Sequence, residues 1–310
     1  MNPLPVRSPA RLSACAAAAL LLALVAPAAA AQEISRGFRI DDDAAIRIFN
    51  LGGTITVRGW DRDSIAITGR VPAADATFYA GGQGAGAKLG VEPKGKGTVP
   101  PRSDLRVFVP RNARVWIKTD EAVIDVAGVA GQVDAFSVGG RVKVTGPVRA
   151  LSIESMDGAV EVEGQMGWVR LKSAGGAVRF SGASDDLAAS SVSGTVVVAA
   201  IRVGRGRIET VTGDIRFSGL PERTGTLAFE THAGRTEVLL PRNAAVDVDL
   251  NTLGGTITNT FTQRQPKPGQ AGRGSVLTFA TDIGGAAVSV RSFKGDILVG
   301  PAPPATAAGQ

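Results

Sequence analysis

A motif of one serine, one glycine and two alternating apolar residues recurs every 18 residues through the middle of the chain. The copies are VDAFSVGGRVKVTG (133–146), LSIESMDGAVEVEG (151–164), VRLKSAGGAVRFSG (169–182) and LAASSVSGTVVVAA (187–200). Self-similarity at a fixed period is typical of architectures in which one short unit stacks on the next. We call each copy a rung.

The repeat continues beyond these four rungs with slightly longer turns. Its serine position is filled by Thr210, Thr231, Thr252 and Ser292 towards the C-terminus, and by Asn50 and Thr119 towards the N-terminus. Ala122 takes the glycine position in one copy. The hexapeptide LGGTIT occurs at 51–56 and again at 253–258 because both copies are the same corner, near the start and the end of a stack of about ten rungs.

Apolar and polar residues alternate within each rung, which predicts strands with one buried face. A constant offset favours a coil over a meander, because in a coil each residue lies against the residue one rung away. We therefore expect parallel strands about 4.8 Å apart. The expected interior column is Val142, Val160, Val178, Val196 and Ile215. The serine and glycine mark a corner, where glycine permits a positive φ or a close approach and the hydroxyl satisfies backbone groups. The fold class is all-β, a single-domain solenoid with rungs of about 18 residues.

Residues 1–31 have the pattern of a secretory signal peptide. Arg7 and Arg11 precede the apolar run 12–25, and small residues at 28–31 form an A-x-A cleavage site. A retained anchor and lipidation of Cys15 are the alternatives. Cys15 is the only cysteine, so the mature chain has no disulfide and no thiolate metal site. After cleavage no transmembrane span is expected.

The solenoid domain is expected at 32–300, with irregular excursions at the Gly/Pro/Lys-rich segments 80–104 and 262–275. The low-complexity tail 301–310 is expected to be disordered. The net charge of +6 is carried by scattered residues, so no nucleic-acid partner is indicated.

No residue pattern predicts a catalytic, cofactor-binding or metal site. His232 is the only histidine and sits at a repeat corner, which excludes a histidine metal cluster. Glu161 and Glu163 lie on one face of one strand, but no neighbouring rung adds a further acid to them. The remaining candidates are interpreted as solvated turns, caps or scattered aromatics: Asp41, Asp42, Asp43, Asp185, Asp186, Trp60, Trp116 and Trp168.

The segments AIRIFNLGGTITVRGWDRDSIAITGRV (45–71) and VFVPRNARVWIKTDEAVIDVAG (107–128), followed by the S-x-x-G-x-V-x-V-x-G rungs, carry a resemblance. Together they resemble the bacterial β-strand-repeat family of unknown function labelled "putative adhesin", over nearly the whole mature chain. The resemblance implies a right-handed parallel β-helix-like solenoid in an exported protein, and it supplies no catalytic residues.

The leading hypothesis is an exported, non-enzymatic solenoid that binds a surface ligand such as an envelope polysaccharide or a surface protein. Its location would be periplasmic, outer-surface or secreted, and no cofactor is expected. A polysaccharide-active hydrolase or lyase is the first alternative, with Glu161 and Glu163 as its candidate acids. An envelope scaffold or regulatory component is the second.

Overall fold

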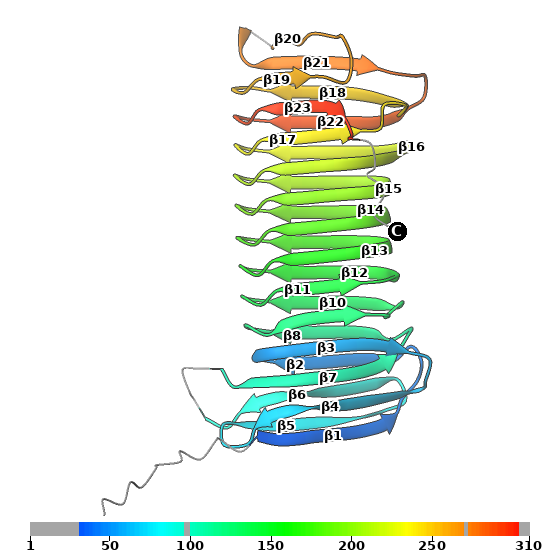
Figure 1. The fold of residues 1–310 in the computed structure, drawn as a ribbon, viewed down its shortest axis with the longest axis vertical. Helices are drawn as coiled ribbons and strands as arrows, with labels where there is room; N and C mark the ends of the chain where they lie inside the picture. Colours follow the sequence, from blue (N-terminus) through cyan, green and yellow to red (C-terminus); the bar gives the residue numbers. More distant parts are fainter. Residues whose placement is uncertain (1–30, 96–99, 270–271, 304–310) are drawn as a thin grey trace, which may run out of the picture.

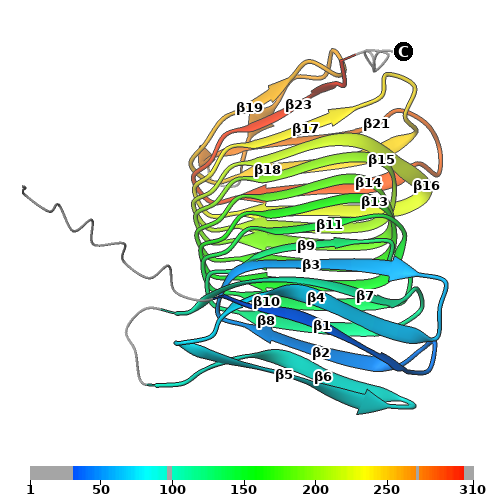
Figure 2. The same cartoon turned by 60° about the horizontal axis from the view of Figure 1, so that its bottom comes forward.

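A computed structural model describes residues 31–95, 100–269 and 272–303. The expected leader up to residue 30 and the tail from residue 304 lie outside the described residues. The described chain is all-β, without an α-helix, and its 23 strands form one sheet stacked into a tall column (Figures 1 and 2).

The strands fall into an N-terminal group, a central repeated group and a C-terminal group. The N-terminal strands are β1 (Ala31–Arg39), β2 (Ala45–Asn50), β3 (Gly52–Trp60), β4 (Ser64–Pro72), β5 (Ala76–Gln83), β6 (Gly86–Pro93) and β7 (Arg102–Pro110). The central strands are β8 (Arg114–Thr119), β9 (Val123–Ala127), β10 (Gln132–Ser137), β11 (Val142–Thr145), β12 (Val148–Ser155), β13 (Val160–Ser173), β14 (Val178–Ser191), β15 (Val196–Thr210), β16 (Ile215–Thr231) and β17 (Thr236–Leu240). The C-terminal strands are β18 (Val246–Thr252), β19 (Ile257–Asn259), β20 (Lys267–Pro268), β21 (Ser275–Ala280), β22 (Ala286–Ser292) and β23 (Ile297–Pro301).

Successive central rungs pair in parallel with the register expected from the repeat. Val142 lies opposite Val160, Val160 opposite Val178, and the column continues through Val196 to Ile215. All five side chains are fully buried. The expected interior column is confirmed, and a meander is excluded for these rungs because every pairing between them is parallel.

The corners also follow the expected columns. Ser137 Oγ donates to the carbonyl of Gly140 at 2.9 Å, and the N–H of Gly176 donates to Ser173 Oγ at 2.9 Å. In the central rungs, close approach rather than a positive φ explains the corner glycine, whereas Gly53 in the N-terminal copy shows both, with a φ of 95°. A Cβ on Gly158 would lie 2.1 Å from the carbonyl oxygen of Gly140 in the next rung.

The N-terminal end departs from the parallel stack. β2 and β3 pair in parallel with β8 and β9, which places Asn50 beside Thr119. Beyond them, β1 pairs with β4, β4 with β7, and β5 with β6, all antiparallel. These strands close the first end of the column at the bottom of Figure 1.

The expectation of an irregular excursion at 80–104 is wrong for most of that segment. It contains β6 and parts of β5 and β7, while residues 96–99 lie outside the described residues. Glycine serves close packing there: a Cβ on Gly90 would lie 2.6 Å from the carbonyl of Phe49 and 2.8 Å from the hydroxyl of Tyr79. In the second segment, 262–275, the described residues hold only β20 and the first residue of β21.

The order of rungs in space differs from their order in the chain at the C-terminal end. β22 pairs in parallel with both β16 and β18, and β23 pairs with both β17 and β19. The last rung of the chain is therefore inserted between two earlier ones. β21 then pairs antiparallel with the outer side of β18 and covers it.

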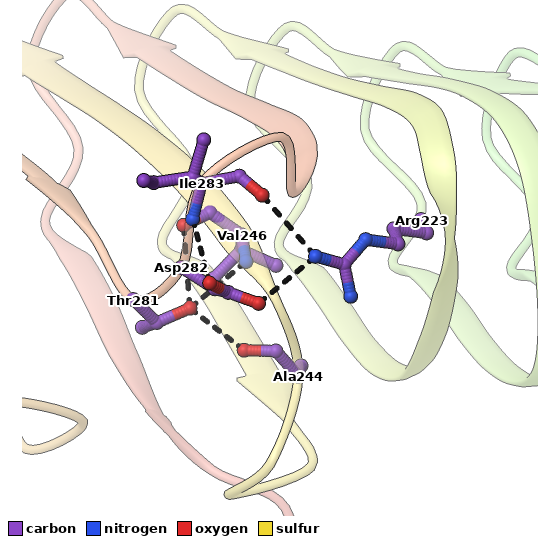
Figure 3. A network of polar contacts seen from close by, with 6 residues as sticks. All are labelled: Arg223, Ala244, Val246, Thr281, Asp282 and Ile283. Atoms are coloured by element: carbon purple, nitrogen blue, oxygen red, sulfur yellow. Dashed lines mark hydrogen bonds and ion pairs between the residues drawn. The ribbon is translucent and has the colours of Figure 1, made fainter.

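A network of hydrogen bonds and one ion pair holds the turn at residues 281–283, which leads into the inserted rung (Figure 3). Arg223 donates to Asp282 Oδ2 at 2.9 Å and to the carbonyl of Ile283 at 3.2 Å. Thr281 Oγ1 donates to the carbonyl of Ala244 at 2.8 Å. The hydrogen bond from the backbone of Ile283 and the ion pair with Arg223 lower the pKa of the Asp282 carboxyl. The network ties residues 281–283 to β16 and to the start of β18.

Candidate binding face

His232 lies at the corner between β16 and β17, as the repeat predicts. Its imidazole is exposed and stacks on the ring of Phe293, with the centroids 4.8 Å apart and the planes 15° from parallel. Phe293 occupies the same corner position in the inserted rung, because Thr231 lies opposite Ser292. No group of three potential metal ligands occurs in the described part of the chain.

The acidic candidates are separated from one another. Glu161 and Glu163 lie on the outward side of β13 after the corner, and Glu161 is 3.6 Å from Arg141. Asp185 and Asp186 are exposed or half-buried and pair with Arg202 and Arg205, both at 3.1 Å. Asp41, Asp42 and Asp43 are exposed in the turn before β2, and Asp42 accepts a hydrogen bond from Asn112. The structure does not bring these acids together.

The three tryptophans have different surroundings. Trp60 stacks on Phe108 with the ring centroids 5.3 Å apart, and its Nε1 donates to the carbonyl of Ser64. These contacts give Trp60 a packing role. Trp116 and Trp168 instead project outward from the strands that approach the serine corner. The interpretation of Trp116 as a scattered aromatic is therefore incomplete.

We call the outward side of the strands that lead into the corner the leading face. It is formed by β2, β8, β10, β12, the C-terminal parts of β13 to β16, β22 and β18, which are hydrogen-bonded in series. Because alternate residues of a strand point outward, each rung contributes the same positions to this face. Its side chains therefore form columns that run the length of the stack.

At the N-terminal end of the leading face, two adjoining hollows of about 470 and 290 Å³ share Trp116 and Asp134 in their walls. We call the pair the aromatic groove. Phe49 meets Trp116 edge to face at a centroid distance of 5.1 Å. Phe136 lies on the other side of Trp116. The remaining polar and charged residues of its wall are Arg47, Arg114, Lys118, Gln132, Ser152 and Glu154.

The cations of the aromatic groove have few acidic partners. None of the ion pairs within the described residues involves Arg47, Arg114 or Lys118. Of the two acids in the wall, Glu154 pairs with Lys172 at 3.3 Å, and Asp134 accepts a hydrogen bond from Gln132 at 2.7 Å. Lys118 lies 5.8 Å from the centre of the Phe136 ring. The groove therefore combines half-exposed aromatic rings with an excess of positive charge.

A third and larger hollow, of about 720 Å³, lies on the same face nearer the C-terminal end. His232 and Phe293 form one side of it, and charged residues of β15, β16 and β22 form the other. Arg207 pairs with Glu209 and lies 3.9 Å from Glu230. The hydrogen bond to Glu209 raises the pKa of the Arg207 guanidinium. Positive and negative charges compensate each other here, unlike in the aromatic groove.

An exposed apolar row runs along the corner edge and was not anticipated from the sequence. The position directly after the corner serine or threonine carries a large exposed hydrophobic residue in six rungs: Val138, Met156, Val192, Val211, Leu253 and Phe293. Four of them, from Val192 onward, also line the larger hollow. The aligned rungs carry this pattern in the sequence, at the position that follows the corner hydroxyl.

No family model matches the chain, and no curated protein matches it in sequence. A solved structure of a "putative adhesin" from Parabacteroides merdae is similar over 86% of this chain and 96% of its own, at 12% identity and a TM-score of 0.50. A "putative lipid binding protein" from Parabacteroides distasonis matches with 13% identity, a TM-score of 0.44, and coverage of 86% and 96%. A "putative adhesin" from Bacteroides fragilis matches with 11% identity, a TM-score of 0.40, and coverage of 86% and 97%.

These likenesses concern the fold alone, and of these three the Parabacteroides merdae structure has a TM-score of 0.50. The chain is thus an all-β protein with structural neighbours that are named adhesins. In the described residues no helix is long and apolar enough to span a bilayer.

Proposed function

We propose that the chain is an exported, non-enzymatic, right-handed parallel β-helix-like solenoid that binds a cell-envelope or surface ligand through its leading face. The 18-residue parallel register supports the solenoid, and the pattern of residues 1–31 supports export. The similarity in fold to the Parabacteroides merdae protein named "putative adhesin" supports a role in binding at a surface. Periplasmic, outer-surface and secreted locations all fit the proposal.

The observation that carries the proposal is the clustering of hollows on one face. The aromatic groove and the 720 Å³ hollow both open on the leading face, and both are lined by aromatic and charged side chains. A concave surface with a few convergent polar groups is where proteins commonly bind ligands. Within each column the side chains follow one another at the strand spacing of about 4.8 Å, a regular arrangement that suits an extended ligand.

The proposal is tested by retention of the chain lacking residues 1–31 on insoluble envelope polysaccharide and on immobilised surface proteins. We expect retention on at least one of them. Retention should fall for substitutions of residues that line the hollows of the leading face. It should persist for the double variant Glu161→Gln/Glu163→Gln, whose carboxylates lie on the strands after the corner. No retention on either material would overturn the proposal. Export is checked separately by cell fractionation and by sequencing the mature N-terminus.

The second candidate is a polysaccharide-active enzyme, favoured by one pair of carboxylates. Glu209 and Glu230 are register partners on adjacent strands, inside the 720 Å³ hollow. Strand spacing places their backbones about 4.8 Å apart, and retaining glycosidases hold their two carboxyl groups about 5–5.5 Å apart. Arg207 engages both acids, which weighs against a free nucleophile. Release of reducing sugar or lyase absorbance that Glu230→Gln abolishes would establish this candidate in place of the first.

A further inference from the structure

We infer that the aromatic groove is a site for an acidic polysaccharide, with Phe49, Trp116 and Phe136 stacking on sugar rings and Arg47, Arg114 and Lys118 pairing with its anionic groups. The inference rests on the proposed function and deepens it by naming the chemical class of the ligand. It concerns only the N-terminal hollows of the leading face, not the charge-compensated hollow near His232.

The three aromatic rings form a row of neighbours on the sheet surface, with Phe49 and Trp116 edge to face. Phe49, Trp116 and Phe136 come from three consecutive strands, β2, β8 and β10. Phe49 lies opposite Lys118, and Trp116 opposite Asp134, so each ring is the diagonal neighbour of the next. Two strand spacings place Phe49 and Phe136 about 9.6 Å apart at the backbone. That span lets a short stretch of a polymer chain lie across all three rings.

All three side chains are half-buried, so each keeps part of its surface exposed to solvent. An aromatic side chain with an exposed face and a fixed orientation offers contact area at little cost in conformational entropy. Trp116 forms a wall shared by the two hollows, so a ligand that spans both must pass over it. Trp116 is therefore the side chain whose loss should matter most.

The charges of the groove select an anionic ligand. Arg47, Arg114 and Lys118 line the hollows without an ion-pair partner in the described residues. In the hollow near His232, Arg207 pairs with Glu209 and Glu230, and the two acids balance the charges of Arg207 and Arg291. Lys88 extends the positive surface, since its ammonium lies 5.2 Å from the Phe49 ring and 5.1 Å from the Tyr79 ring. Arg114 donates through Nε to the carbonyl of Asp43 at 3.3 Å, which leaves its other N–H groups for a ligand. Guanidinium groups without a carboxylate partner are suited to pairing with the carboxylate or sulfate of a ligand.

The acids of the groove favour a polysaccharide over a nucleic acid. Asp134 and Glu154 are carboxylate acceptors inside the same walls. They can accept hydrogen bonds from sugar hydroxyls, but they would repel a continuous phosphate backbone. The combination of open rings, unpaired cations and hydroxyl acceptors fits a polymer whose hydroxyl groups alternate with negative charges.

The test measures binding of the chain lacking residues 1–31 to defined probes by titration calorimetry. The probes are an oligogalacturonate, its methyl-esterified neutral form, dextran sulfate, and a single-stranded DNA oligonucleotide. We expect binding to the oligogalacturonate or to dextran sulfate, which separates carboxylate from sulfate as the anionic group. We expect weaker binding to the neutral ester and to the oligonucleotide, and an affinity that falls as salt rises.

Two variants and a matched control localise the site. Trp116→Ala should weaken binding about tenfold, as truncation of a central aromatic anchor does. Arg47→Gln/Arg114→Gln should abolish the preference for the charged probe over its ester. Trp168→Ala removes a tryptophan from the same face, outside the walls of the groove, and should leave binding unchanged. Unchanged thermal unfolding of each variant shows that the fold is retained.

The outcomes separate this inference from the proposed function. Retention on envelope material that Trp116→Ala does not reduce, or equal affinity for the ester and the acid, overturns the inference and leaves the proposed function standing. Tighter binding to the oligonucleotide, or no binding to either acidic probe, also overturns the inference. Binding to an acidic probe that depends on Trp116, without retention on envelope material, supports the site and removes the wider proposal.

Discussion

Replacing Thr236 by valine should make the protein more stable, although the change removes a polar group from a strand. Thr236 is fully buried at the start of β17, and its hydroxyl has no hydrogen-bond partner among the described residues. Ile215 and Ile297 lie opposite it on the two neighbouring strands, in the same interior column as the valines of the central rungs. Its hydroxyl thus occupies a place where every neighbouring rung has a methyl group.

The expected gain follows from the cost of burying an unpaired hydroxyl, about 1–3 kcal/mol in mutational data. Valine has nearly the same shape, so the column needs no repacking. The backbone hydrogen bond from Thr236 N–H to the carbonyl of Asp296, at 2.9 Å, does not depend on the side chain. We take the lower end and expect a gain of about 1 kcal/mol, or roughly 2 °C in Tm for a chain of this length.

Two measurements test the prediction: the free energy of unfolding in urea, and the rate of amide hydrogen exchange at residues 236–240. The second is needed because stability in stacked repeats is partly local. The matched control is Thr231→Val in the preceding corner. Thr231 Oγ1 accepts from the N–H of Gly234 at 3.1 Å and also bonds Thr210 Oγ1 at 3.1 Å. Removing that hydroxyl leaves buried groups unpaired and should destabilise the protein by about 1–3 kcal/mol.

The reasoning is refuted if Thr236→Val destabilises the protein as much as Thr231→Val does. That result would mean that the hydroxyl of Thr236 is hydrogen-bonded in solution and that the interior column is not dry at this rung. Equal hydrogen exchange in the two variants would point the same way.

Two further substitutions test the corners. Gly140→Ala places a Cβ 2.0 Å from the carbonyl oxygen of Ala122, a backbone atom that cannot yield without moving a rung, so we expect about 3 kcal/mol of destabilisation in urea unfolding. Gly139→Ala, one residue away, meets nothing closer than 3.9 Å and should be nearly neutral; equal effects would contradict the argument. Asp296 accepts hydrogen bonds from the N–H and the hydroxyl of Thr256, both at 2.8 Å, and these bonds lower the pKa of its carboxyl. The stabilisation by Asp296 is therefore complete above its unfolded-state pKa, about 3.9, and is lost as pH falls through the lower folded pKa. Asp296→Asn should reduce Tm near neutral pH, with a difference that shrinks in acid; a difference independent of pH would refute the assignment.

The repeat predicted much of the fold because its columns are physical contacts. Ser137, Ser155, Ser173 and Ser191 align at one offset in the sequence and lie opposite one another in the structure. The same reasoning could not order the terminal rungs. Every rung presents a similar edge for parallel pairing. The repeat therefore predicts which positions of two paired rungs lie opposite each other, but not which rungs are neighbours.

The antiparallel strands at the N-terminal end were missed for a different reason. Segment 80–104 is rich in glycine, which usually indicates a loop. Here Gly90 lies against Phe49 and Tyr79, where no larger side chain fits. The glycine content therefore reflects crowding between strands, which composition alone does not distinguish from flexibility.

The aromatic groove does not follow from the repeat, although its residues leave a signal in the sequence. Trp116 and Phe136 are 20 residues apart, one rung plus two, so they occupy different columns and appear unrelated when only like positions are compared. On a sheet surface, however, residues displaced by two along the neighbouring strand are diagonal neighbours. Aromatic residues separated by one rung plus or minus two residues are therefore the sequence pattern of this groove.

The inserted rung at the C-terminal end has a consequence for how the chain acquires its structure. β22 and β23 are the last strands to be synthesised, yet β16 and β18 meet only through them. Residues 246–259 therefore lack their native neighbour in the column until residues 286–301 have emerged. A ribosome or an export channel that delivers the chain from its N-terminus releases a column that can lengthen in sequence only as far as β17. Completion waits for the final segment, so a polypeptide truncated before residue 286 ends in an open edge.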